Sequence, residues 1–149
     1  MPLKYYITEY YSTGTRRGLG KELKKHLPYV DTLEECDVFI NCKYDEFSQV
    51  DLLYDAVDLG KRVINIGSNV SNMSYDSRNK YQIHKAALDK ANTQLFYAGH
   101  NVTNIKFGYF DSPVQENNHG EKMSIQYCRD VILWILEQPH RIKSITVSI

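Results

Sequence analysis

The sequence lacks long apolar runs, net charge and paired cysteines. Its longest strongly apolar run, residues 131–136, is far too short to span a bilayer, and the N-terminus has no apolar segment of the signal-peptide type, so we expect no membrane contact. Lysine plus arginine and aspartate plus glutamate each number 18, and a neutral chain is a poor candidate for binding nucleic acid phosphates. Three cysteines form neither a C-x-x-C pair nor an even disulfide set, which indicates a reduced, cytoplasmic compartment.

Metal-binding spacing is also missing. The five histidines are dispersed and show neither an H-x-x-x-H nor an H-E-x-x-H pattern, so we expect no metal site. What the chain does have is an ordinary globular composition, with 42% hydrophobic and 24% charged residues, and this excludes a wholly disordered chain. At 149 residues we expect one domain that spans residues 1–149.

Segments typical of strands alternate with segments typical of helices. This alternation predicts an α/β fold, a doubly wound parallel sheet with right-handed crossovers and helices on both faces. Such sheets bind ligands beyond the carboxyl ends of their strands, near the point where strand order reverses. We expect strands at residues 4–9, 37–41, 62–66, 102–107 and 142–149, and helices at residues 18–26, 49–59, 80–97 and 122–137.

A glycine-containing turn follows the first expected strand. Residues 13–20 read T-G-T-R-R-G-L-G, which is not the G-x-G-x-x-G spacing of a dinucleotide fingerprint. The turn nevertheless meets the same needs: a tight bend, close approach of backbone to a pyrophosphate, and a helix N-terminus that faces the phosphates. A plain glycine-rich turn is the competing interpretation.

Three further residues form a chemical pattern. Tyr81 and Lys85 are four positions apart and so lie on one helix face. An ammonium near a phenol lowers the pKa of the tyrosine from about 10, which makes it usable as a proton donor or acceptor near neutral pH. Ser68 leaves a buried strand, where its hydroxyl could bind a substrate oxygen. The simpler interpretations are an exposed helical pair and a loop serine or helix cap.

Together and in this order, the patterns resemble the short-chain dehydrogenases/reductases. Residues 13–20 match the T-G-x-x-x-G-x-G loop of that family, and Ser68, Tyr81 and Lys85 match its catalytic serine, tyrosine and lysine. Residues 37–41 look like the strand that leads into its N-N-A-G motif. Residues 104–108 look like its strand that ends in P-G.

The resemblance implies a single NAD(P)-binding Rossmann-fold domain and an NAD(P)-dependent oxidoreductase, a carbonyl reductase or alcohol dehydrogenase for a small carbonyl or alcohol substrate. Tyr81 would exchange a proton with the substrate oxygen, Ser68 would orient that oxygen, and Lys85 would bind the nicotinamide ribose and lower the pKa of Tyr81. The implied cofactor-binding residues are Thr13, Gly14, Thr15, Arg16, Arg17, Gly18, Leu19, Gly20, Asn41, Tyr81, Lys85 and Gly108.

The chain also departs from the family pattern. Family members are longer, and the segment that normally holds their second and third strands is reduced here to residues 27–36, so we expect a truncated sheet of about five strands. The N-N-A-G motif reads Asn41-Cys42-Lys43-Tyr44, and P-G reads Phe107-Gly108. The catalytic asparagine of the family would fall near residues 45–47, which contain none.

Cofactor choice and assembly follow from the same resemblance. Arg16 and Arg17 favour NADP, because guanidinium groups suit a 2′-phosphate, although a solvated helix start is their simpler interpretation. NAD remains possible through Asp31. Because the shortened sheet loses covering helices, we expect a homodimer or homotetramer through residues 49–59 and 80–97.

Two other functions stay open. A non-catalytic nucleotide-binding module on the same fold would explain the deletions and the missing asparagine. The retained Ser68, Tyr81 and Lys85 argue against it, because a binding protein has no need of them. A flavodoxin-like regulatory domain with another phosphate ligand leaves Tyr81 and Lys85 unexplained.

Overall fold

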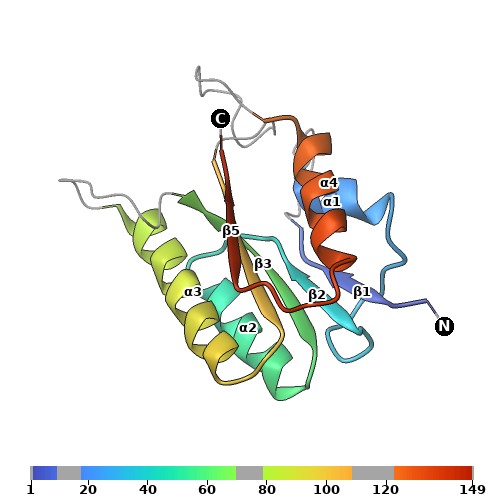
Figure 1. The fold of residues 1–149 in the computed structure, drawn as a ribbon, viewed down its shortest axis with the longest axis horizontal. Helices are drawn as coiled ribbons and strands as arrows, with labels where there is room; N and C mark the ends of the chain where they lie inside the picture. Colours follow the sequence, from blue (N-terminus) through green and yellow to red (C-terminus); the bar gives the residue numbers. More distant parts are fainter. Residues whose placement is uncertain (1, 10–17, 70–78, 109–122, 149) are drawn as a thin grey trace.

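The computed structural model describes residues 2–9, 18–69, 79–108 and 123–148. Five parallel strands form one sheet with the order β1-β2-β3-β4-β5 (Figure 1). The prediction of an α/β fold with about five parallel strands is therefore confirmed. The strands are β1 (Tyr5–Ile7), β2 (Val38–Asn41), β3 (Arg62–Ser68), β4 (Val102–Phe107) and β5 (Ser144–Val147), and the helices are α1 (Leu19–Lys24), α2 (Ser48–Asp58), α3 (Lys80–Tyr97) and α4 (Ile125–Leu136).

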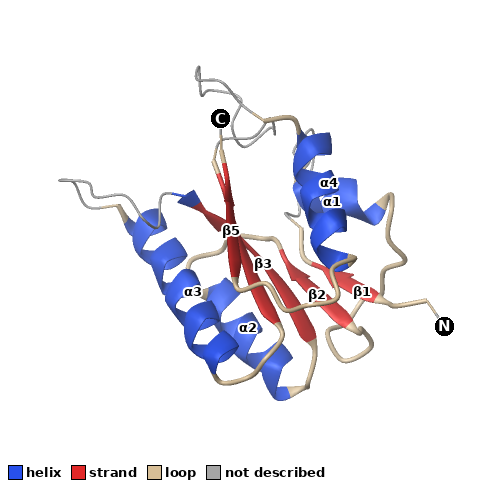
Figure 2. Ribbon diagram, in the orientation of Figure 1, coloured by secondary structure: helices blue, strands red, loops and turns tan. Residues whose placement is uncertain are grey.

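Helices cover both faces of the sheet, as the alternation predicts. Helices α1 and α4 lie on one face and α2 and α3 on the other (Figure 2). Strand β2 is buried throughout because its side chains point alternately to the two layers. Val38 and Ile40 pack in the cluster under α1 and α4, whereas Phe39 packs in the cluster under α2 and α3.

The expectation that all crossovers share one hand fails at one helix, α4. The connections through α2, α3 and α4 each move the chain by one strand in the same direction across the sheet, so crossovers of one hand would place these three helices on one face. Because α4 lies opposite α2 and α3, its crossover has the opposite hand to theirs. Helix α1 leads from β1 outward to Tyr29, in the opposite direction and on the opposite face, so its crossover has the same hand as those of α2 and α3. The chain moves from β1 outward to Tyr29 and then returns to β2 on the other side of β1, so the direction of travel reverses between β1 and β2, and a ligand is expected at the carboxyl edge there.

The shortened segment at residues 27–36 still covers the outer edge of β1. Tyr29 forms a single parallel bridge with Tyr5. The Tyr5 amide donates to the Pro28 carbonyl at 3.0 Å, and the Val30 amide donates to the Tyr5 carbonyl at 2.8 Å. This one-residue remnant of a second strand pairs an edge that would otherwise expose its backbone groups.

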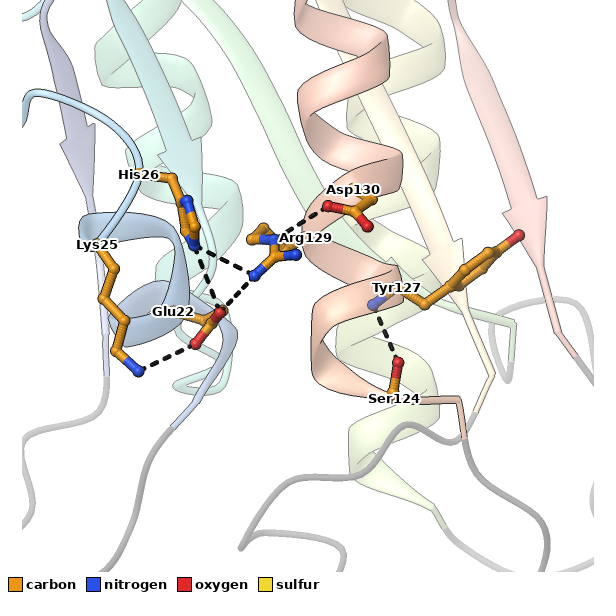
Figure 3. Close-up of polar contacts among 7 residues, drawn as sticks. All are labelled: Glu22, Lys25, His26, Ser124, Tyr127, Arg129 and Asp130. Carbon is orange, nitrogen blue, oxygen red and sulfur yellow. Dashed lines mark hydrogen bonds and ion pairs between the residues drawn. The ribbon is translucent and has the colours of Figure 1, made fainter.

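An ionic cluster joins α1 to α4 (Figure 3). The Glu22 carboxylate accepts hydrogen bonds from Arg129 Nη1 at 2.8 Å and from Lys25 Nζ at 3.2 Å. Burial opposes ionisation of Glu22, but these hydrogen bonds outweigh it and lower the pKa of the carboxyl. Arg129 also donates from Nε to Asp130 at 3.0 Å. The cluster fixes α1 against α4 on the face that contains neither Tyr81 nor Lys85.

Candidate active site

The three residues proposed for catalysis lie on β3 and α3. Ser68 is the last residue of β3 and is buried. Tyr81 and Lys85 lie one turn apart near the start of α3. The Asn79 side chain caps this helix, because it accepts a hydrogen bond from the Gln82 amide at 3.0 Å. Tyr81 is 38% exposed and Lys85 only 3%. The structure therefore places a partly exposed phenol above a buried amine at the carboxyl end of the sheet.

The last part of the glycine-rich turn lies against the end of β1. Thr13, Gly14, Thr15, Arg16 and Arg17 are outside the described residues. Gly18 precedes α1, and Leu19 is buried as its first residue. A Cβ on Gly20 would lie 2.6 Å from the Thr8 carbonyl oxygen, so α1 can approach the strand end this closely only with glycine at position 20. The turn thus reaches the carboxyl edge where a nucleotide is expected.

The Lys85 ammonium is held by two neutral oxygens. Its Nζ donates to Gln49 Oε1 at 2.8 Å and to the Ile66 carbonyl at 2.9 Å. Burial disfavours the charged form and lowers the pKa of Lys85 from 10.5 to about 8, an effect that nearby Cys42 partly opposes. Lys85 therefore changes its charge close to neutral pH.

Gln49 is a site residue that the sequence patterns did not reveal. It is 2% exposed, near the start of α2. Its Nε2 donates to the Asn41 carbonyl at 2.9 Å and to the Ile66 carbonyl at 3.1 Å, so its Oε1 is left to face Lys85. A signal existed in the sequence: Gln49 is the one polar member of the buried stripe of α2, whose other members are Leu53, Ala56 and Val57.

A chain of buried amides connects this glutamine to the interior. Asn41 of β2 and Asn65 of β3 are register partners. Asn41 Nδ2 donates to Asn65 Oδ1 at 2.9 Å and to the Gln49 carbonyl at 2.7 Å. Asn65 Nδ2 donates to Asn92 Oδ1 at 3.0 Å, and Asn92 donates to the Lys143 carbonyl at 2.9 Å. The Asn41 side chain, proposed as a cofactor contact, is fully buried in this network.

Tyr44 stands where the family motif has its glycine, and it packs over the site. Its ring meets the Tyr81 ring edge-on at 4.7 Å between centroids, and its hydroxyl is 2.7 Å from His84 Nδ1. Lys85 Nζ lies 5.4 Å from the centroid of Tyr44 and 5.6 Å from that of Tyr81. Burial, with smaller contributions from Glu46 and Asp45, raises the pKa of Tyr44. Tyr44 is therefore a neutral aromatic cover beside both reactive groups.

Of the two other proposed residues, Gly108 lies beside the end of β3, where Ser68 pairs with Phe107, and Asp31 lies apart from the site. Gly108 directly follows β4, and a Cβ there would lie 3.1 Å from Ser148 Cβ, so it packs closely against the end of the chain. Asp31, the candidate for an NAD ribose contact, is exposed and lines a groove along α2 with Asp55 and Asp58. That groove belongs to α2, which lies on the face of the sheet opposite α1.

Within residues 2–9, 18–69, 79–108 and 123–148, no group of three or more histidine, cysteine or acidic side chains could hold a metal ion. No helix in that part of the chain has the length and apolar character needed to cross a membrane.

Three solved structures with this fold are two dehydrogenases and a ketoreductase. No protein-family model and no curated protein sequence matches the chain. A short-chain dehydrogenase from Burkholderia cenocepacia J2315 in complex with NADP superposes with a TM-score of 0.70 at 16% identity, over 97% of this chain and 87% of that one. A 4-hydroxyisoleucine dehydrogenase mutant complexed with NADH and succinate gives 0.72 at 13% identity, over 97% and 96% of the two chains.

A third neighbour extends the same comparison. An angucycline C-6 ketoreductase with bound NADP gives a TM-score of 0.67 at 12% identity, over 98% of this chain and 93% of that one. At such identities the likeness shows the fold alone. The fold of the chain is that of the short-chain dehydrogenases in a truncated, five-stranded form, as the sequence resemblance predicts.

Proposed function

We propose that the protein is an NAD(P)-dependent oxidoreductase of the short-chain dehydrogenase type, acting on a small carbonyl or alcohol. The observation that carries the proposal is the Tyr81 phenol above the buried Lys85 amine, at the carboxyl edge of the sheet. The solved structures with this fold add support, because they are dehydrogenases or reductases described with NADP or NADH. The close approach of α1 to β1 at Gly20 fits a nucleotide at this edge.

A bound nicotinamide cofactor would supply the hydride chemistry. Tyr81 donates its phenolic proton to the substrate oxygen in reduction and accepts a proton in oxidation. The Lys85 ammonium stabilises the phenolate that this transfer leaves behind. Ser68, at the end of β3, orients the substrate oxygen.

The position of Lys85 limits its other proposed role, which is a hydrogen bond to the nicotinamide ribose. The lysine is almost fully buried beside the Tyr44 and Tyr81 rings, and two of its three ammonium hydrogens are directed to Gln49 and Ile66. A hydrogen bond from Lys85 to a nicotinamide ribose therefore requires the aromatic cover of Tyr44 and Tyr81 to open. Without that movement, Lys85 acts on Tyr81 through its charge.

The burial of Lys85 also favours a second candidate function. A nucleotide-binding module without catalysis would keep the fold and the glycine-rich turn while Lys85 serves only in the buried polar network. The two functions differ in one measurable respect: a binding module takes up NADPH or NADH but does not oxidise it with any substrate.

A cofactor-oxidation screen tests the proposal. NADPH and NADH are supplied in parallel with a panel of aldehydes and ketones, and loss of the reduced cofactor is followed by absorbance. We expect substrate-dependent oxidation with at least one pair. Binding of a cofactor with no oxidation across the panel would favour the module instead, and absence of binding would contradict both.

NADP is the favoured cofactor in this proposal, on the strength of Arg16 and Arg17 and of the position of Asp31 along α2. Arg17→Glu would place a negative charge near the 2′-phosphate and should weaken NADPH binding more than NADH binding. Titration of both cofactors against both proteins measures the ratio. If the ratio does not change, Arg17 does not read the phosphate.

We also propose a homo-oligomer formed through α2 and α3. The residues of these helices that face the sheet, such as Leu53 and Leu88, are fully buried, but Tyr54, Ile83 and Tyr97 remain exposed on the outside. A symmetric pair of helices would cover them. Light scattering at micromolar concentration should give at least twice 17.3 kDa, and a stable, fully active 17.3 kDa particle would contradict this. The three free cysteines support a reducing compartment, and we place the protein in the cytoplasm.

A further inference from the structure

Among the described residues, the buried Lys85 ammonium has no acidic partner, and its two acceptors come from α2 and β3. We propose that Gln49 is the positioning residue that holds the Lys85 ammonium next to Tyr81, in a chain with no asparagine at residues 45–47. The inference rests on the proposed function for its role in catalysis, but the coupling between Gln49 and Lys85 is testable without any turnover.

The orientation of the Gln49 amide is fixed by its neighbours. Its Nε2 donates to the carbonyls of Asn41 and Ile66, and an oxygen in that position could not donate to either. The backbone of Gln49 is held as well, because its carbonyl accepts from Asn41 Nδ2 at 2.7 Å. Gln49 Oε1 is thus directed at Lys85 before any ligand arrives.

Gln49 supplies half of the hydrogen-bond support of the ammonium. An ammonium that leaves water needs acceptors around it, or it becomes neutral. In the described part of the chain, the other acceptor is the Ile66 carbonyl, which already accepts from Gln49 Nε2. Loss of the Gln49 side chain would therefore leave Lys85 with one acceptor and favour the neutral amine.

The other titratable groups around Lys85 do not compensate for this charge. Burial raises the pKa of the Cys42 thiol to about 12, and burial also raises the pKa of Tyr44, so both are neutral at pH 7. Tyr81 and His84 are the titratable neighbours of Lys85 along α3. No carboxylate forms an ion pair with Lys85 among the described residues.

Two substitutions at Gln49 should act in opposite directions. Gln49→Leu removes an acceptor from the ammonium, which lowers the pKa of Lys85. Gln49→Glu replaces that acceptor with a carboxylate, which raises it. One hydrogen bond to a charged group corresponds to a move of roughly one to two pH units in the midpoint. Gln94→Leu, an exposed glutamine on α3, is the matched control.

The first measurement is the pH dependence of unfolding by urea between pH 6.5 and 11, for each variant with Lys85 present and with Lys85→Met. The free energy of unfolding should rise with pH once the pH exceeds the folded pKa of Lys85. Compared with the wild-type protein, we expect this rise to start at lower pH in Gln49→Leu and at higher pH in Gln49→Glu, and to be absent in Lys85→Met. Equal effects of Gln49→Leu with and without Lys85 would overturn the proposal. Gln49→Glu keeps the size of the side chain but loses the two hydrogen bonds that Nε2 donates, so it too is compared with and without Lys85, and that pair gives the answer if Gln49→Leu does not fold.

The second measurement uses the enzyme, once a substrate is known. The alkaline limb of the pH–rate profile should shift to lower pH in Gln49→Leu and to higher pH in Gln49→Glu, as the midpoint from the unfolding experiment does. Gln94→Leu should leave the profile unchanged. If substitutions at Gln49 shift the pH dependence of stability but the protein turns over no substrate, the proposed function is contradicted and the coupling to Lys85 stands. If the protein turns over substrate but its pH–rate profile is unchanged by substitutions at Gln49, the positioning role is contradicted.

Discussion

The two faces of the sheet differ in what they bury. Under α1 and α4 the core is mostly apolar; its polar groups are the buried Thr103, the Glu22 carboxylate paired with Arg129 (Figure 3), and Arg62, which donates to carbonyls at the end of α4. Under α2 and α3 the apolar cluster shares the interior with Asn41, Asn65, Asn92, Gln49 and Lys85.

Buried polar groups are costly unless each finds a partner, so an interior of amides and an amine adds little to stability by itself. The network ends at Lys85, beside Tyr81, and it fixes the position of that lysine through Gln49. The two layers therefore differ in their main contribution. The layer under α1 and α4 stabilises the sheet, and the layer under α2 and α3 contains the network next to the candidate reactive groups.

The largest expected effect tests the apolar face. Ile132 of α4 is fully buried, and Ile132→Ala should lower the free energy of unfolding by about 2–5 kcal/mol, because it removes buried methyl groups and leaves a cavity. Ile83→Ala, at an exposed position on α3, should change it by less than about 0.5 kcal/mol. Urea denaturation at pH 7 measures both. Equal effects would mean that burial does not govern stability at these positions.

A somewhat smaller effect tests the polar face. The folded pKa of Lys85, about 8, lies below the ordinary 10.5, so between these values the unfolded chain binds the proton more strongly and folding becomes more favourable as pH rises. The wild-type protein should therefore gain about 3 kcal/mol relative to Lys85→Met between pH 8 and pH 10.5. Lys90→Met, an exposed lysine on the same helix, controls for the loss of one charge. A difference that stays constant with pH would contradict the burial of the charge.

Local signals predicted the elements well. Helix α3 and strand β4 have the predicted bounds. Gly60 and Gly99, with φ of +75° and +101°, follow the predicted ends of α2 and α3, because only the left-handed backbone of glycine turns the chain there without strain. The order of Ser68, Tyr81 and Lys85 also pointed to the correct fold, since that order reflects successive elements of the sheet.

The contacts that the sequence could not predict join residues from different strands and helices. Asn41 and Asn65 are distant in sequence and meet only because β2 and β3 pair in that register. The hands of the crossovers follow from which face each helix covers, which helix periodicity does not encode. Gln49 was detectable as a polar residue on a buried stripe, but its partner Lys85 required the packing of α2 next to α3.

The most direct test of the proposed chemistry compares one tyrosine from each helical layer in the same cofactor-oxidation assay. Tyr81→Phe removes the proton donor on α3, and Tyr127→Phe removes an exposed phenol on α4. With a substrate identified for the wild-type protein, Tyr81→Phe should lose about 10²–10⁴-fold in turnover while cofactor binding is kept, and Tyr127→Phe should retain full turnover. If Tyr81→Phe keeps more than half of the wild-type rate, or if both variants lose activity alike, Tyr81 is not the acid of this site.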